Sequence, residues 1–274
     1  MKDTVEKLLS YRKRYFSKRG EDGLLAFVLS KIPDRTNWCV EFGAWDGKSE
    51  SNTYYFISQQ GYHGVMIEAD PFKYDLLCEN MKAHGTICIN AFVRSEGENK
   101  LDNILSLTPV PKEFDLLSID VDGDDYHIWK SLDAYQPKIV IIEINIRDKP
   151  GVRRINKPGR PIVRGDSGTN VSSMWGITGY TGTSLSSMTE LAVSKHYSLL
   201  ANVHCNAAFV RCEYLHLFHD REVTPDEVFT YEGHRLRELS FREMRSLGCR
   251  QIIERRSRRR LWWLFSPLKD SPKP

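Results

Sequence analysis

Residues 38–47 read Trp38-Cys-Val-Glu-Phe-Gly-Ala-Trp-Asp-Gly47, an apolar run that leads directly into a glycine turn. The run is short and mostly apolar, which is typical of a buried strand. A helical pattern follows over 51–60, and Gly61 ends it. A buried strand joined to a helix by a glycine turn is the opening unit of a parallel sheet covered by helices. This stretch therefore predicts an α/β fold.

The alternation of strands and helices extends along the chain on both sides of this unit. Apolar runs predict further strands at 64–68, 86–90, 114–120, 138–145, 197–203 and 207–211, and helical patterns cover 1–16, 21–31, 71–83, 126–132 and 184–195. The last two strands are close enough to form a hairpin, which predicts one antiparallel edge on the sheet. We predict a Rossmann-like, mostly parallel seven-stranded sheet with helices on both faces.

The chain divides into three parts by its composition. Residues 1–36 are expected to form N-terminal helices, 37–212 the sheet domain and 213–274 a C-terminal extension. Within the sheet domain, 147–183 is rich in Gly, Pro, Ser, Thr and Arg, which indicates a substrate loop or a solvated loop. Arginines in this loop would suit an acidic or phosphorylated sugar, namely Arg147, Arg153, Arg154, Arg160 and Arg164.

Composition excludes several classes of protein. With 41% hydrophobic and 27% charged residues the chain is globular rather than disordered. It contains no apolar run long enough to span a membrane, and its first residues lack the apolar segment of a signal peptide. We therefore expect a cytoplasmic protein whose six cysteines are reduced and mostly buried. We interpret the group His204, Cys205, Cys212, His216 and His219 as ordinary thiols and histidines, because its spacing matches no zinc finger.

Polar residues stand at the end of every predicted strand of the parallel part, where open sheets of this kind bind ligands. Trp45 occupies the place of the second glycine in a dinucleotide-binding turn, so a pyrophosphate is not expected there. Glu68 ends the second strand and is placed to accept hydrogen bonds from two ribose hydroxyls. A ribose without a pyrophosphate points to an adenosyl ligand such as S-adenosylmethionine.

Three motifs of the sequence resemble FkbM-type S-adenosylmethionine-dependent methyltransferases, over roughly 18–212. They are Val40-Glu-Phe-Gly-Ala-Trp-Asp-Gly47 with Ser51-Asn-Thr53, Gly64-Val-Met-Ile-Glu68, and Asp115-Leu-Leu-Ser-Ile-Asp-Val-Asp-Gly123. The segment Gly20-Glu-Asp-Gly23 ahead of the first strand belongs to the same resemblance. It implies a class I methyltransferase fold with an antiparallel seventh strand, and O-methylation of sugars in glycans or natural products. The family commonly has Asp-Val-Glu-Gly where this chain has Asp120-Val-Asp-Gly.

The resemblance also implies roles for individual residues. Glu41, Gly43 and Trp45 would line the methionine part of the cofactor, and Asp120 would approach the same end. Glu68 would hold the ribose, and Asn90 and Ala91 would border the adenine. The same motifs place four further residues in the predicted cofactor site: Ala44, Gly47, Asn52 and Ala69.

Candidate catalytic and metal-binding residues follow the fourth and fifth strands. Oxygen ligands suit Mg²⁺ or Mn²⁺, which would polarise a sugar hydroxyl, and the candidate ligands are Asp120, Asp122, Glu143 and Asn145. Asp122 is equally suited to act as a base. We interpret Asp124 and Asp125 as acids at a helix N-terminus. His127 is a candidate general base, although a single histidine at such a position is more often a packing residue.

The C-terminal extension is strongly basic. From residue 242 onward ten Lys and Arg oppose three acids, although the whole chain carries only +3. Residues 255–265 join five arginines to Leu, Trp and Phe, a composition that suits an anionic membrane surface. Docking on the domain or on a second subunit, and nucleic-acid binding, are the alternatives.

The sequence therefore favours an O-methyltransferase that acts on a sugar hydroxyl of a glycan or a lipid-linked saccharide. Such an enzyme would work in polysaccharide biosynthesis, in the cytoplasm or peripherally at the inner face of the membrane. A nucleic-acid methyltransferase is one alternative, but no element for a flipped base or RNA module is visible. A non-catalytic, membrane-anchored scaffold with the same fold is the other. The oligomeric state is left open.

Overall fold

The computed structural model describes residues 2–121, 123–158 and 182–229, and side chains from Val5 onward. Its centre is a seven-stranded sheet in the order β3-β2-β1-β4-β5-β7-β6, in which only β7 runs antiparallel to its neighbours. The strands are β1 (Trp38–Phe42), β2 (His63–Glu68), β3 (Ile87–Asn90), β4 (Leu116–Ile119), β5 (Ile139–Glu143), β6 (Tyr197–Val203) and β7 (Asn206–Arg211).

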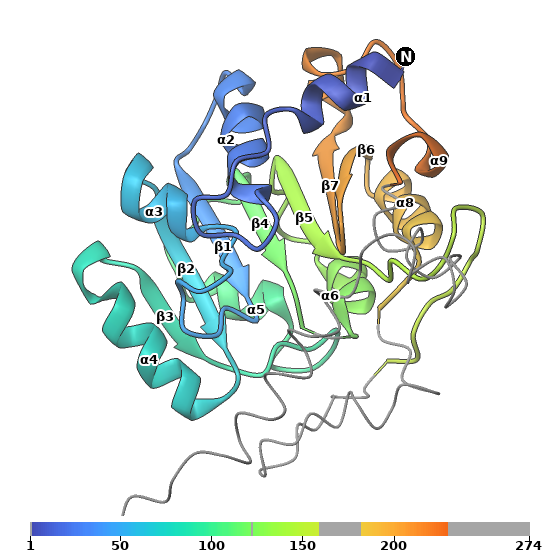
Figure 1. The fold of residues 1–274 in the computed structure, drawn as a ribbon. Coiled ribbons are helices and arrows are strands. Elements are labelled where there is room, and N and C mark those ends of the chain that lie inside the picture. Colours follow the sequence, from blue (N-terminus) through green and yellow to red (C-terminus); the bar gives the residue numbers. More distant parts are fainter. Residues whose placement is uncertain (1, 122, 159–181, 230–274) are drawn as a thin grey trace, which may run out of the picture. The chain divides into compact units, whose positions relative to one another are not determined.

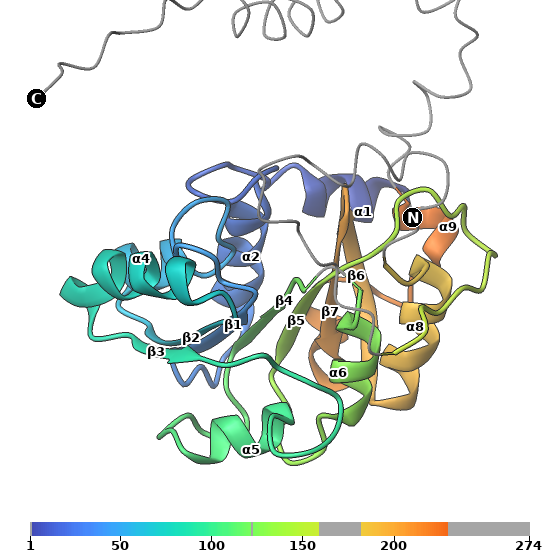
Figure 2. The ribbon, with the colours of Figure 1, turned by 90° about the horizontal axis from the view of Figure 1, so that it is seen from below.

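Helices cover both faces of the sheet (Figures 1 and 2). On one face lie α2 (Glu21–Lys31), α3 (Tyr54–Gln60) and α4 (Pro71–Met81), the last continued by the 3₁₀ turn η1 (Lys82–His84). The other face carries α5 (Leu101–Ser106), α6 (Asp125–Ser131) and α8 (Leu185–Ser194). Beyond the edge strand β6 lie α1 (Lys2–Leu9), η2 (Cys212–Leu217) and α9 (Pro225–Val228). This is the predicted three-layer arrangement.

Alternation along the strands separates two hydrophobic cores. In β1, Val40 and Phe42 pack on the side of α5, α6 and α8, whereas Cys39 packs on the side of α2, α3 and α4. In β5, Val140 packs on the side of α5, α6 and α8, and Ile141 packs on the side of α2, α3 and α4. Because successive side chains of a strand point to opposite faces, apolar runs without alternation supply both cores at once.

The predicted class I methyltransferase fold is confirmed, including the antiparallel seventh strand that the resemblance implies. The expectation drawn from the hairpin pattern was wrong at the sheet edge. The sequence predicted that the hairpin formed by the last two strands adds an antiparallel edge. The antiparallel strand β7 instead lies between β5 and β6, so the edge strand β6 is parallel to β5. The hairpin turn is tight, and β7 turns back into the space beside β5, where Ala207 and Ala208 pair with Ile142 and Ile141.

Two other predictions were wrong, and one helix was missed. The first helix ends at Leu9 instead of residue 16, because residues 15–17 donate hydrogen bonds to a carboxylate further along the chain. Helix α5 was not predicted, since its six residues carry too little periodicity. Of the five described cysteines, all free, only Cys39 is buried.

The segment before α2 is fixed to the domain by two buried acids. Asp22 accepts hydrogen bonds from the backbone N–H of Phe16 (2.6 Å) and Ser17 (2.9 Å) and from the Ser17 hydroxyl (2.7 Å). Glu21 accepts one from the Asn206 side chain of β7 (3.0 Å). A Cβ added at Gly23 would lie only 2.3 Å from the Lys13 nitrogen, so the close approach of this segment requires glycine. These contacts place residues 17 and 18 beside the sheet.

Within the described residues, no helix combines the length and the apolar character that crossing a membrane needs.

Candidate cofactor-binding site

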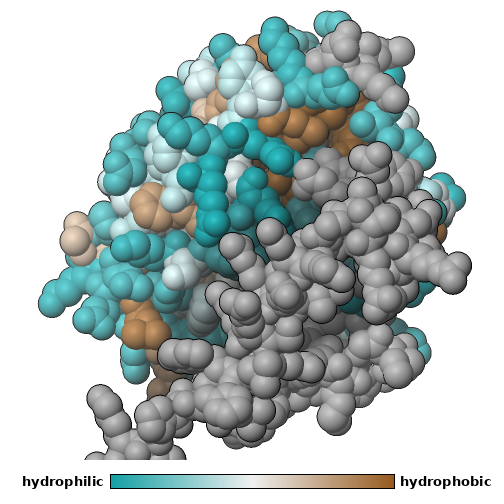
Figure 3. Space-filling view, viewed as in Figure 1, coloured by the Kyte–Doolittle hydropathy of each residue, from teal (hydrophilic) through white to brown (hydrophobic). Residues whose placement is uncertain are grey.

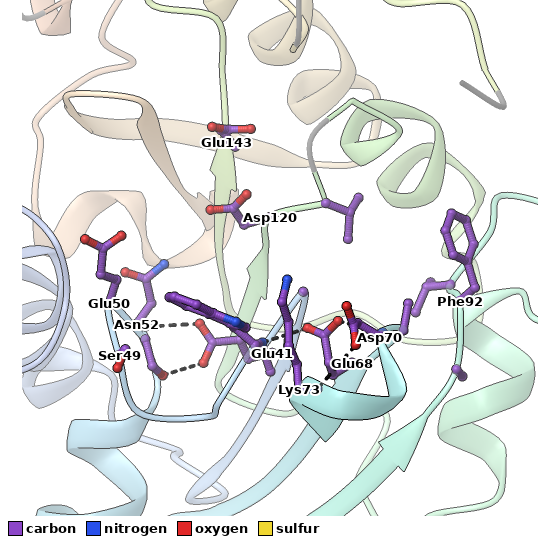
Figure 4. A pocket seen from close by; sticks show the side chains of 18 of the residues that line it. Glu41, Ser49, Glu50, Asn52, Glu68, Asp70, Lys73, Phe92, Asp120 and Glu143 are labelled. Carbon is purple, nitrogen blue, oxygen red and sulfur yellow. Dashed lines mark hydrogen bonds between the residues drawn. The ribbon is translucent and has the colours of Figure 1, made fainter. Parts of the chain in front are cut away.

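A cavity of about 600 Å³ opens at the carboxyl ends of the parallel strands (Figure 4). It lies where the order of the strands reverses between β1 and β4, which is the usual ligand position in open α/β sheets. On the face drawn in Figure 3, the described surface is mainly hydrophilic, with only separate hydrophobic patches. The lining residues are Lys18, Glu41, Gly43, Ala44, Trp45, Ser49, Glu50, Ser51, Asn52, Glu68, Ala69, Asp70, Lys73, Ala91, Phe92, Val93, Asp120, Val121, Asp124 and Glu143.

The turn after β1 forms the floor of the cavity and depends on its first glycine. Gly43 has φ +73°, and a Cβ there would lie 1.7 Å from the carbonyl oxygen of Asp120 at the end of β4. Only glycine allows the two chain segments to approach this closely. Trp45 also has positive φ (51°), which is unusual for a large side chain, and the residue lines the cavity and is 45% exposed. Gly47 packs against Leu77 of α4 and does not line the cavity.

Glu68 connects the end of β2 to this turn. Its Oε2 accepts a hydrogen bond from the Trp45 backbone N–H and its Oε1 one from the Asp70 N–H, both at 2.8 Å. The residue is 8% exposed and faces the cavity (Figure 4). Each carboxylate oxygen can accept a second hydrogen bond, so two ligand hydroxyls can be bound at once.

Glu41 lines the cavity as predicted, but its carboxylate is used by the protein itself. It accepts hydrogen bonds from the hydroxyls of Ser51 (2.5 Å), Thr53 (2.6 Å) and Ser118 (3.2 Å) and from the Asn52 backbone N–H (3.1 Å). The Asn52 side chain also donates to Ser118 (3.1 Å). This network joins β1, β4 and the start of α3, and it explains why that helix begins later than predicted. We interpret Glu41 as a residue that positions the cavity wall.

Residues after β2 and β3 form the wall near Glu68. Ala69, Ala91 and Phe92 line the cavity, whereas the Asn90 side chain donates to the backbone carbonyls of Glu68 (2.8 Å) and Ala69 (3.3 Å). Asn90 therefore holds the ends of the two strands together and does not face the cavity. Phe92, which the sequence did not single out, adds an apolar surface at this end (Figure 4).

Carboxylates at the end of β5 and just after β4 line the opposite part of the cavity. Asp120 and Glu143 lie above Glu41 in Figure 4, and Asp124 lines the same space. Asp125 points elsewhere: its carboxylate accepts hydrogen bonds from the N–H groups of Val121 (2.9 Å) and Gly123 (2.8 Å). Asp125 is the first residue of α6, where an acid was expected, and its carboxylate holds the turn that precedes the helix.

Besides Gly47 and Asn90, two further predicted site residues do not line the cavity. The Nε2 of His127 donates a hydrogen bond to the carbonyl oxygen of Asn156 (2.6 Å). Asn145 is buried, and its side-chain oxygen accepts a hydrogen bond from the Arg147 N–H (2.8 Å). Asp122, predicted as base or metal ligand, lies outside the described residues.

The described residues form no group of three or more His, Cys, Asp or Glu able to hold a metal ion. The set predicted to bind Mg²⁺ or Mn²⁺ includes Asp122, so that prediction stays untested.

The histidines and cysteines near the hairpin of β6 and β7 make ordinary contacts within the protein. His219 is buried against the Leu200 carbonyl (3.0 Å), and His216 contacts the Glu213 carbonyl (2.8 Å). Cys212 contacts the Ser198 hydroxyl (3.3 Å).

Lys18 and Glu50 line the cavity although the sequence had not indicated them. Their side chains form an ion pair of 2.9 Å. The hydrogen bond to Glu50 raises the pKa of Lys18, and the charge of Asp120 acts in the same direction. Burial raises the pKa of the nearby Cys205 thiol to about 12, with Glu143 and Asp120 adding to the effect. The only sequence signal for Lys18 was its position beside the motif Gly20-Glu-Asp-Gly23.

Two of the loop arginines predicted to receive an acidic substrate are paired within the protein. Arg153 pairs with Glu190 of α8, and the Arg154 Nε lies 3.5 Å from the Asp148 carboxylate. Arg160 and Arg164 lie outside the described residues, as does the basic C-terminal segment.

Comparison with known proteins gives structural likeness only, since no family model and no curated protein matches the sequence. The CurJ carbon methyltransferase has a TM-score of 0.44 and 9% identity, and the alignment covers 69% of this chain and 52% of that one. The chain thus spans about half the length of that protein. The Podospora anserina methyltransferase PaMTH1, solved bound to SAH, has a TM-score of 0.42 and 18% identity, with 76% and 86% coverage. A Bacillus cereus O-methyltransferase in complex with SAH has a TM-score of 0.40 and 15% identity, with 76% and 90% coverage.

Proposed function

We propose that this protein is an S-adenosylmethionine-dependent methyltransferase. The observation that carries the proposal is Glu68, a carboxylate at the end of β2 that is fixed by two backbone N–H groups at the edge of the cavity. A carboxylate so placed is suited to bind the two hydroxyls of a ribose. The cavity volume of about 600 Å³ lies within the range of small-molecule sites.

The residues around Glu68 fit an adenosyl group. Ala91 and Phe92 offer an apolar surface to a flat base on one side of the ribose position. On the other side Ala44 and Trp45 continue the wall toward Asp120. Trp45 occupies the position at which a second glycine would admit a pyrophosphate, so the cavity suits a nucleoside that carries no pyrophosphate.

The acceptor side of the cavity supports transfer to a hydroxyl group. When bound, S-adenosylmethionine supplies a methyl group carried on a positively charged sulfur. The carboxylates of Asp120 and Glu143 line the end of the cavity away from Phe92, where a carboxylate can take the proton that the acceptor hydroxyl loses. Asp122 follows the same strand and stays a candidate for this role.

We further propose a sugar hydroxyl of a glycan or lipid-linked saccharide as the acceptor. Support comes from the sequence resemblance, and from Asp120 and Glu143, because carboxylates are good acceptors for sugar hydroxyls. Contact of the basic C-terminal segment with an anionic membrane, where lipid-linked saccharides are found, is part of the same proposal.

Calorimetric titration with S-adenosylmethionine, followed by transfer of labelled methyl groups to glycans, tests the proposal. Saturable binding of one cofactor per chain and labelled glycan are expected. If the folded protein binds no S-adenosylmethionine, the proposed function is wrong. If it binds the cofactor but labels RNA instead of glycans, the acceptor class is wrong.

A further inference from the structure

An ion pair forms part of the cavity wall at the end away from the proposed adenosyl position. Lys18 Nζ lies 2.9 Å from the Glu50 carboxylate, and the two side chains are 51% and 48% exposed. Both residues line the cavity. In Figure 4, Glu50 lies on one side of Glu41, whereas Glu68 lies on the other. A ligand that contacts Glu68 can therefore extend along the cavity toward the pair.

Positive charge is scarce along this cavity. Among its described lining residues, seven are acids and two are lysines. Lys73 lies between Glu41 and Glu68 in Figure 4, with its Nζ 5.5 Å from the centre of the Trp45 ring, whereas Lys18 pairs with Glu50. Lys18 is thus the lysine that an anionic group at the Glu50 end of the cavity would meet.

The pair is built into the fold and is not a chance surface contact. Ser17 and Glu50 form a parallel β-bridge, which joins the two segments through their backbones. Asp22 fixes Ser17 through its backbone N–H and its hydroxyl. Glu50 has φ 61°, a backbone conformation that a glutamate adopts only when its surroundings impose it. The fold therefore presents one cation and one anion side by side to the cavity.

We propose that Lys18 and Glu50 recognise the amino-acid end of S-adenosylmethionine, an inference that rests on the proposed function. That end carries a carboxylate and an ammonium group, which are the charges complementary to Lys18 and Glu50. In the free protein the two side chains neutralise each other. On binding, Lys18 pairs with the ligand carboxylate and Glu50 with the ligand ammonium, so all four charges stay paired. Recognition at this end is therefore an exchange of ion-pair partners.

Two probes separate this role from binding of the nucleoside. S-adenosylmethionine carries the amino-acid end, whereas 5′-methylthioadenosine has the same adenosyl group and lacks it. We expect Lys18→Met and Glu50→Gln each to weaken S-adenosylmethionine binding at least tenfold in calorimetric titrations. Affinity for 5′-methylthioadenosine should stay within twofold, which also shows that the variants are folded. Arg221→Met removes a partly exposed ion pair outside the cavity and should change neither affinity.

The exchanged pair, Lys18→Glu with Glu50→Lys, distinguishes recognition from simple support of the wall. If the ion pair only fastens the segment to the wall, the exchange restores S-adenosylmethionine affinity. If the pair recognises the ligand, affinity stays low, because each ligand charge then faces a like charge. Unchanged S-adenosylmethionine affinity in the single variants, together with loss of affinity in Glu68→Ala, would overturn the inference and leave the proposed function intact. Failure of the unaltered protein to bind either probe would overturn both.

Discussion

The Oε2 atom of Glu68 lies 2.8 Å from the backbone nitrogen of Trp45, so the carboxylate at the end of β2 holds the turn that follows β1. The same side chain is thus both a proposed ligand of the ribose and a support for the floor of the cavity. Its N–H partners fix its orientation before a ligand arrives, which lowers the ordering cost of binding.

Replacement of Glu68 by alanine should weaken S-adenosylmethionine binding at least about tenfold, because hydrogen bonds to a charged acceptor contribute about 1.5–3 kcal/mol each. Calorimetric titration measures the change. Glu113→Ala is the matched control, since Glu113 pairs with Arg211 and does not line the cavity. An unchanged dissociation constant for Glu68→Ala would remove the ribose assignment.

Glu41→Ala should destabilise the domain by about 3 kcal/mol or more, because four donors lose their acceptor in a buried place. Urea unfolding followed by circular dichroism gives the free energy of unfolding. Ser106→Ala removes one exposed hydroxyl hydrogen bond and should have little effect. A loss below about 1 kcal/mol would show that the network does not hold the cavity wall.

Lys138→Met should lower the free energy of unfolding by about 3–5 kcal/mol, because it leaves the buried Asp115 carboxylate without its cation. Lys138 Nζ lies 2.9 Å from that carboxylate, and both side chains are buried. Neither residue lines the cavity, so cofactor affinity should not change. In Arg153→Met, where the broken ion pair is exposed, the loss should stay within about 1 kcal/mol. Equal losses in the two variants would contradict the expected effect of burial.

Glu227 should titrate with a pKa of about 2, because hydrogen bonds from Arg221 hold its carboxylate in the charged form and the Thr224 N–H adds a further bond. Since the pKa is lower in the folded state, the stabilisation is present above the ordinary value of about 4.3 and is lost as the pH falls through about 2. Carbon NMR of the side-chain carboxyl measures this titration. Arg221→Met should shift the midpoint upward, and an identical midpoint in that variant would exclude Arg221 as the cause.

Asp122→Asn should lose turnover while cofactor affinity is kept, if Asp122 acts at the reacting centre after β4. Methyl transfer from labelled S-adenosylmethionine and calorimetric titration provide the two measurements. Full turnover in the variant would discard the role. Turnover of the unaltered protein that persists after exhaustive chelation would discard only the metal.

Local sequence was enough to predict β1, the turn at Gly43 and the position of Glu68. An apolar run, a glycine and an acid at a strand end each act within a few residues, so their pattern is visible without the fold. Asp120 could be placed at the cavity for the same reason, since parallel strands end at one edge of a sheet.

Roles that depend on distant partners could not be predicted in this way. From the sequence, Glu41 was expected to bind the cofactor. Its carboxylate instead accepts hydrogen bonds from Ser118, which is far away in the chain, and from residues just before α3. Lys18 reaches the cavity only because Asp22 shapes the preceding loop and Glu50 adopts a left-handed backbone. The position of β7 inside the sheet was missed because a hairpin pattern does not show which of its strands lies outside.

The place of β7 in the sheet has a consequence for folding on the ribosome. Since β7 lies between β5 and β6, the edge strand β6 emerges before the strand that will join it to the sheet. The hydrogen bond that Glu21 accepts also depends on this strand, because its donor Asn206 lies 185 residues further along the chain. The nascent domain therefore cannot complete its sheet, or form the hydrogen bond between Glu21 and Asn206, until Arg211 has left the exit tunnel. Until then the edge of β5 that will pair with β7 stays open in the growing chain.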